Sequence, residues 1–210
     1  MSGTFEILFV LYPRFTQLDF AGPYEVFCRI PGVRVRLASP DGGDLVTEHG
    51  LTYRGLERLA DIDRCDLICV PGGADQSSVT APETLAEIAR LAGGARFTTS
   101  VCNGSLVLGA AGLLRGRRSA CHWAMRHLLA GYGATPDEAR VVRDGDLITG
   151  GGVTAGIDFA LACAAEIADA TVAQAIQLLI EYAPAPPFGS GRPETAAPGV
   201  MEAFQKLVAG

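Results

Sequence analysis

The chain has 210 residues, enough for one well-buried domain, and 49% of them are hydrophobic. Its formal net charge of −6, without any run of basic residues, argues against nucleic acid or an anionic membrane as a partner. No apolar stretch is long enough to span a bilayer, and the first residues lack the basic segment of a signal peptide. We therefore expect a cytoplasmic protein.

The first part of the chain predicts three buried strands, at 5–11, 33–38 and 66–70, with a helix at 24–30 and a small hairpin within 41–52. Asp19 follows the first strand, where it either caps the helix or faces a ligand, because ligands collect at the carboxyl ends of parallel strands. Gly72 and Gly73 follow the third strand. Two glycines there form a tight turn or let a ligand approach the backbone closely.

Cys102 stands at the junction between an expected strand at 97–101 and an expected helix at 103–112, after a helix at 82–91. The unpaired N–H groups of a helix start favour negative charge, so we expect the pKa of this thiol to fall from about 8.5 to roughly 3.5–7.5. The pattern Ser100-x-Cys102-x-Gly104 is a cysteine analogue of the nucleophile elbow. The alternative is a buried structural thiol.

The rest of the chain continues the alternation of strands and helices. His122, beside Trp123, is either an acid–base group or a packed core residue. A hairpin is expected at 139–149, helices at 154–168 and 171–182, an extended arm rich in Pro and Gly at 183–199, and a short helix at 200–208. The pattern predicts a single domain over 1–210 with a flavodoxin-like, doubly wound α/β fold, its mostly parallel sheet covered by helices on both faces.

If the strands at 5–11, 66–70 and 97–101 are neighbours, Asp19, the Gly72-Gly73 turn and Cys102 meet over one crevice. The N–H groups of Gly73 and Asn103 would then form an oxyanion cradle. Like charge disfavours ionisation of a carboxyl beside a thiolate, so Asp19 would hold a proton and act as the acid. Scattered cysteines and only three histidines make a metal site improbable.

Five motifs carry a resemblance to the ThiJ/PfpI superfamily, within the class I glutamine-amidotransferase-like fold, and within it most closely to the bacterial isocyanide hydratases. They are LDFAGP at 18–23, VPGG at 70–73, SVCNGS at 100–105, ITGGGVTAGID at 148–158 and EYAPAPPF at 181–188. The resemblance covers essentially the whole chain. It implies a homodimer that hydrates isocyanides to N-substituted formamides without a cofactor, through a thioimidate on Cys102, with Asp19 as acid and base. The candidate substrate-pocket residues are Gly72, His122, Gly152 and Val153.

One departure from the pattern lies next to the nucleophile. The hydratases usually carry threonine there, whereas this chain has Asn103, whose amide we expect to hydrogen-bond Asp19. Two alternatives stay open. His122 falls where glyoxalase-type and deglycase-type relatives have a histidine, which favours a cofactor-free enzyme of that type. An exposed thiolate of low pKa would also suit a redox sensor.

Overall fold

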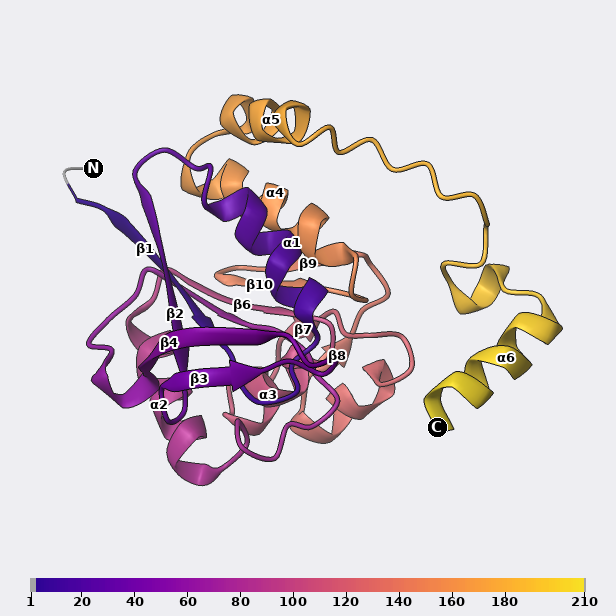
Figure 1. Cartoon of the computed structure of the whole chain (residues 1–210), viewed down its shortest axis with the longest axis horizontal. Helices are drawn as coiled ribbons and strands as arrows, with labels where there is room; N and C mark the ends of the chain where they lie inside the picture. Colours follow the sequence, from indigo (N-terminus) through magenta and orange to yellow (C-terminus); the bar gives the residue numbers. More distant parts are fainter. Residues whose placement is uncertain (1–2, 210) are drawn as a thin grey trace.

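The computed structural model describes residues 3–209 and has a central sheet of eight strands (Figure 1). The strands are β1 (Phe5–Val10), β2 (Val33–Ser39), β3 (Gly43–Val46), β4 (Thr52–Arg58), β5 (Leu67–Val70), β6 (Phe97–Val101), β9 (Val141–Asp144) and β10 (Leu147–Gly150). Their order is β3-β4-β2-β1-β5-β6-β10-β9. Neighbours from β4 to β10 are parallel, and the edge strands β3 and β9 are antiparallel. A short separate ladder joins β7 (Arg118–Ser119) and β8 (Thr135–Pro136).

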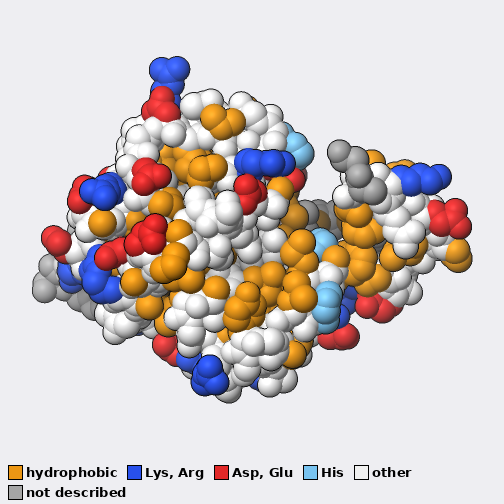
Figure 2. Space-filling model, turned by 90° about the horizontal axis from the view of Figure 1, so that it is seen from below, with side chains coloured by type: hydrophobic (Ala, Val, Ile, Leu, Met, Phe, Trp, Pro, Cys, Tyr) orange, Lys and Arg blue, Asp and Glu red, His pale blue; other side chains and the backbone are white. Residues whose placement is uncertain are grey.

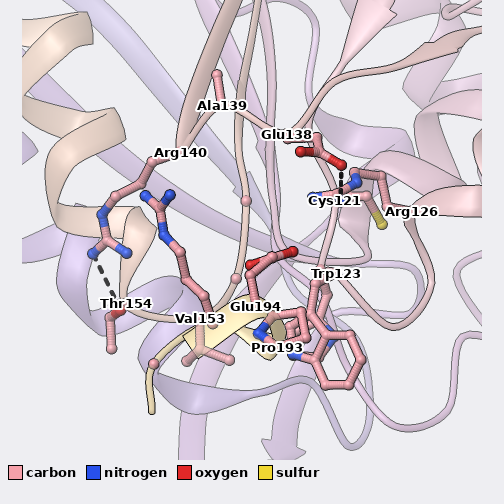
Figure 3. Close-up of a pocket in the computed structure, with 15 residues that line it drawn as sticks. Cys121, Trp123, Arg126, Glu138, Ala139, Arg140, Val153, Thr154, Pro193 and Glu194 are labelled. Atoms are coloured by element: carbon pink, nitrogen blue, oxygen red, sulfur yellow. Dashed lines mark hydrogen bonds and ion pairs between the residues drawn. The ribbon is translucent and has the colours of Figure 1, made fainter. Parts of the chain in front are cut away.

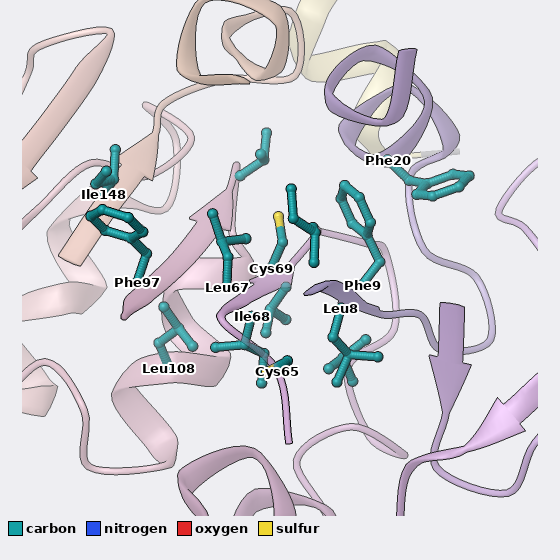
Figure 4. Close-up of a cluster of buried hydrophobic side chains, with 14 of the residues drawn as sticks. Leu8, Phe9, Phe20, Cys65, Leu67, Ile68, Cys69, Phe97, Leu108 and Ile148 are labelled. Carbon is teal, nitrogen blue, oxygen red and sulfur yellow. The ribbon is translucent and has the colours of Figure 1, made fainter. Parts of the chain in front are cut away.

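Helices cover both faces of this sheet, as the sequence predicts. On one face α1 (Gln17–Phe27) packs against α4 (Ala155–Ile167), and α4 against α5 (Ala170–Leu179). On the other face lie α2 (Pro82–Gly94) and α3 (Gly104–Ala110). Successive side chains of a strand point to opposite faces of the sheet, so alternate residues pack against the two helix layers. Figure 4 shows Phe9 and Cys69 on the side of Phe20 in α1, whereas Leu8 and Ile68 lie on the side of Leu108 in α3. The flavodoxin-like fold class is therefore confirmed.

The first helix begins earlier than the expected 24–30. It starts at Gln17, so Asp19 lies in its first turn, and the N-cap is Thr16, which makes no side-chain capping bond. Gly22 and Pro23 read as a helix boundary in the sequence but lie inside α1. A Cβ on Gly22 would come within 3.1 Å of Ile157 Cγ1, so this glycine allows α1 to pack closely on α4. Asp19 is thus brought to the sheet edge by a helix turn and is not the cap of that helix.

The segment after α5 leaves the body of the molecule (Figure 1). Residues 183–197 are extended apart from one 3₁₀ turn at Pro193–Thr195, and α6 (Pro198–Ala209) follows. Figure 2 shows the C-terminal segment as a lobe that meets the body through apolar side chains. Across residues 3–209, none of the helices has the length and apolar character needed to cross a bilayer.

Candidate active site

Cys102 occupies a sharp turn between β6 and α3, with a left-handed φ of +59°. This conformation costs energy for a residue with a side chain and is the signature of a nucleophile elbow. The Cys102 N–H is anchored on Gly150 O at 3.1 Å. A Cβ on Gly104 would lie 2.1 Å from Val70 O, so only glycine lets α3 start against the end of β5. The elbow expected from the sequence is present.

Asp19 is completely buried next to this elbow. Its Oδ2 accepts a hydrogen bond from the Gly72 N–H at 2.9 Å. Its Oδ1 is buried with no hydrogen-bond partner that meets standard geometry among the described residues, and the carboxyl interacts with the Cys102 thiol. Burial raises the pKa of Asp19 to about 7. The pKa of Asp19 is thus raised, as expected from the sequence, but the main cause is burial and not the like charge of the thiolate.

The expected lowering of the Cys102 pKa is wrong in direction. The thiol is only 6% exposed, and its burial, followed by the neighbouring charge of Asp19, raises its pKa above the ordinary value. The Asn103 N–H at the start of α3 acts in the opposite sense but is outweighed. Because each negative charge disfavours the other, Asp19 and Cys102 together hold a proton near neutral pH.

Asn103 supports the turn that follows β5 and does not bond Asp19. Its Oδ1 accepts from the Gly73 N–H at 2.9 Å, and its Nδ2 donates to Gly73 O at 3.0 Å and to Met125 Sδ at 3.3 Å. An amide carries both a donor and an acceptor, so it matches a peptide group better than it matches a carboxyl. The Gly73 N–H therefore already donates to the Asn103 side chain, and the Asn103 N–H donates to the Cys102 sulfur, so neither group is free to bind an oxyanion. This corrects the expected oxyanion cradle.

Gln76 is a supporting residue that the sequence reading missed. Its Nε2 donates to Asn103 O at 2.9 Å, and its side chain also interacts with the Tyr12 hydroxyl, which donates to Pro71 O at 2.9 Å. These bonds hold the loop after β5 on the elbow. No local pattern marks Gln76, because its partner lies 27 positions away.

A cavity of about 280 Å³ lies on the side of Cys121, and neither Cys102 nor Asp19 is part of its wall (Figure 3). His122, Gly152 and Val153 of the expected pocket line it, together with Cys121, which lies close enough to Cys102 to influence its pKa. Gly72 is absent from the wall of this cavity, and its N–H donates to the Asp19 carboxyl. Cys121 is thus the residue that links the cavity wall to the buried Cys102.

Charged residues from several segments also line the cavity, and the sequence reading passed over them. They are Arg126, Glu138, Arg140, Arg192 and Glu194. Arg126 pairs with Glu138 at 2.9 Å, and Arg140 pairs with Asp158 at 2.7 Å. Burial lowers the pKa of His122, so its imidazole is neutral at neutral pH. Over residues 3–209, no group of three or more His, Cys, Asp and Glu is placed to hold a metal ion.

Gly72→Ala is expected to disrupt the site. The added Cβ would lie 2.2 Å from Asn103 Oδ1, 2.6 Å from Asp19 Oδ2 and 2.9 Å from Cys102 Cβ, so all three groups must move. We expect destabilisation of about 1–3 kcal/mol in urea unfolding. Gly93→Ala in α2 is the matched control, since its Cβ meets nothing within 4 Å and should be neutral or stabilising. Equal stability of the two variants would contradict the close approach at Gly72.

Asp19 should also make stability depend on pH. Its pKa rises from an ordinary 3.8 to about 7 on folding, so its contribution is complete below pH 4 and is lost as pH rises through 7. Relative to an Asp19→Asn variant, which does not titrate there, the unfolding free energy should fall by about 1.4 kcal/mol per pH unit within this window. Urea unfolding of both proteins at several pH values measures this difference. A constant difference would show that the carboxyl is not titrating in that range.

Comparisons with known proteins identify the family and confirm the fold. The DJ-1/PfpI family model matches residues 5–166. A Pseudomonas putida protein named isonitrile hydratase is 49% identical over 205 residues, which cover 97% of this chain and 90% of that protein. The crystal structure of a ThiJ/PfpI family protein from Pseudomonas syringae is 40% identical, with a TM-score of 0.94 over 99% of this chain and 87% of that one. Drosophila melanogaster DJ-1beta, 23% identical, shares the fold, with a TM-score of 0.77 over 85% of this chain and 98% of that one. The chain belongs to the DJ-1/PfpI family.

Proposed function

We propose that this protein is a cysteine-dependent isocyanide hydratase that converts R–NC to the N-substituted formamide R–NH–CHO. The likeness to the Pseudomonas putida isonitrile hydratase over nearly the whole chain supports the reaction. The observation that carries the proposal is the buried, interacting pair of Asp19 and Cys102 at the elbow. An isocyanide carbon must receive both a nucleophile and a proton, and this pair holds one of each.

In the first step, the Cys102 thiol gives its proton to the Asp19 carboxylate, and the resulting thiolate attacks the terminal carbon. The sulfur electron pair forms the C–S bond, and the Asp19 proton goes to the same carbon, which gives the thioimidate R–N=CH–S. The Asn103 N–H favours the thiolate form that this step needs. Asp19 leaves the step as a carboxylate, stabilised by the Gly72 N–H.

In the second step, water adds to the thioimidate carbon. One water proton goes to nitrogen, and the other returns to Asp19, which now acts as the base. The C–S bond breaks, and the product R–NH–CHO leaves with the Cys102 thiolate regenerated. The sum of the two steps is R–NC plus one water, and the proton on the pair is restored.

The dimensions of the site favour a narrow reacting group on a small substituent. An isocyanide head is linear, so it can reach a thiol that is only 6% exposed. The substituent R would occupy the cavity of about 280 Å³. Because a cavity of about 150 Å³ is enough to hold benzene, a single ring fits. We therefore propose isocyanides bearing an alkyl group or one aromatic ring.

Incubation with phenyl isocyanide and, separately, with methylglyoxal tests the assignment. We expect N-phenylformamide, measured by mass spectrometry, with the Cys102→Ala protein as blank. Formation of lactate from methylglyoxal and no formamide would instead favour the glyoxalase alternative, which rests on neutral His122 in the cavity wall. Among the described contacts the only hydrogen bond to the His122 ring comes from the Ala124 N–H, so nothing joins it to Cys102.

The redox-sensor alternative requires an accessible thiolate of low pKa. Cys102 is buried and its pKa is raised, which weighs against that role.

We further propose a cytoplasmic homodimer. Six free cysteines suit a reducing compartment. Exposed apolar side chains at Leu178, Leu179 and Phe188 suit contact with a second copy. Sedimentation equilibrium should give twice the mass of one chain, and a monomer at micromolar concentration would contradict the dimer.

A further inference from the structure

The C-terminal arm returns to the cavity after leaving α5. Residues 191–194 form part of its wall, although they lie about 40 positions beyond the Gly151–Thr154 segment opposite. Figure 3 shows Pro193 and Glu194 between Trp123 on one side and Val153 on the other. Part of the cavity wall is thus built from a segment outside the sheet and its covering helices.

This wall is attached weakly. Within the described chain, the hydrogen bonds of residues 184–209 join only one another, as in the bonds from Thr195 Oγ1 to Gly189 O and Arg192 O. No ion pair links these residues to the body in the part of the chain that the structure describes. One contact between α6 and the body is that of the Phe204 and Trp123 rings, whose centroids are 5.0 Å apart. Such a ring pair contributes about 0.5–1.5 kcal/mol beyond its buried area.

Met201 and Phe204 of α6 are half-buried, whereas its other large apolar residues are exposed. Val200, Leu207 and Val208 share one helix face with Phe204, at spacings of four, seven and eight residues from Val200, and Leu207 is 82% exposed. Phe204 therefore differs from its neighbours in having a ring partner on the body. We call the contact of Phe204 with Trp123 the latch; because Trp123 itself lines the cavity, the latch joins α6 to the cavity wall.

We propose that the C-terminal arm is the detachable outer wall of the substrate cavity, and that the contact of Phe204 with Trp123 makes it a specificity-determining element. The proposal rests on the hydratase function above. The closed arm binds the substituent R through residues 191–194, whereas the isocyanide head passes Cys121 to react at Cys102. Opening of the latch should weaken binding of a ring-sized substituent and leave the chemistry at the head unchanged.

Phe204→Ala tests the latch, and Leu207→Ala, one turn further on the same helix, is the matched control. Trp123 is the single tryptophan of the chain, so its emission reports the latch without any assay of activity. We expect a red shift and stronger acrylamide quenching in Phe204→Ala, and parental fluorescence in Leu207→Ala. Unchanged emission in Phe204→Ala would overturn the proposal, because α6 would then not lie on Trp123 in solution.

Calorimetric titration with N-phenylformamide, the proposed product, gives the binding readout. Phe204→Ala should raise its Kd by roughly two- to tenfold, the equivalent of one ring contact, and Leu207→Ala should not. For hydration, KM for phenyl isocyanide should rise in Phe204→Ala with kcat retained, while KM for methyl isocyanide stays unchanged. If KM of Phe204→Ala rose equally for both substrates, or if this variant bound N-phenylformamide with the parental Kd, the arm would not be a specificity-determining wall. If the parent did not hydrate isocyanides but Phe204→Ala still bound N-phenylformamide more weakly than Leu207→Ala, the proposed function would be wrong and the role of the arm in binding would remain supported.

Discussion

Replacement of Cys102 by alanine is expected to lower isocyanide hydration by at least about a thousandfold. The substitution removes the sulfur that forms the C–S bond, and the neighbouring Cys121 thiol interacts with Ser105 and not with the Asp19 carboxyl. The backbone strain at φ +59° is the same for alanine, so the fold should be retained. Initial rates of formamide production, with circular dichroism and thermal unfolding to confirm the fold, measure the effect.

The matched control for this variant is Cys28→Ala. Cys28 is an exposed free thiol at the end of α1, away from the cavity, and its removal should leave the rate within a factor of about two. A Cys102→Ala protein that kept the parental rate would remove the nucleophile assignment. A loss of rate with both variants would instead point to a general effect of thiol removal.

Asp19→Asn should lower kcat by about 10²–10⁴, the usual contribution of a positioned acid or base. Asparagine keeps nearly the same shape and can still accept the Gly72 N–H through its amide oxygen, but it has no proton to give to the isocyanide carbon. The Cys102 thiol also loses the neighbour that takes its proton. The rate of the first turnover, followed by formation of the covalent adduct in mass spectrometry, measures the loss directly.

The pH profile separates this role from a structural one. In the parent, the rate should follow the shared titration of Asp19 and Cys102, with an inflection near the Asp19 pKa of about 7. That inflection should vanish in Asp19→Asn. A variant with unchanged kcat and an altered unfolding free energy alone would show that the carboxyl only supports the Gly72 turn.

The sheet, its parallel order and the elbow follow from local patterns in the sequence. The runs at 5–11 and 66–70 are short, apolar and β-branched, so they predict buried strands whatever surrounds them. Cys102 is flanked by such a strand and by small residues that suit a closely packed helix, so its position at the turn is also fixed locally. The adjacency of β1, β5 and β6 then brings Asp19, Gly72 and Cys102 together at one sheet edge.

Only the tertiary structure determines the hydrogen-bond partners of the site residues and the direction of their pKa shifts. The amide of Asn103 found the Gly73 peptide group and not Asp19, since a folded loop presents both a donor and an acceptor to it. The pKa of Cys102 rises because burial, which a helix start in the sequence does not reveal, outweighs the pull of the N–H groups. The arm reaches the cavity across about 40 positions of sequence. Sequence neighbours thus set where each strand, turn and nucleophile lies, whereas solvation and contacts between distant segments set how the nucleophile ionises and what surrounds it.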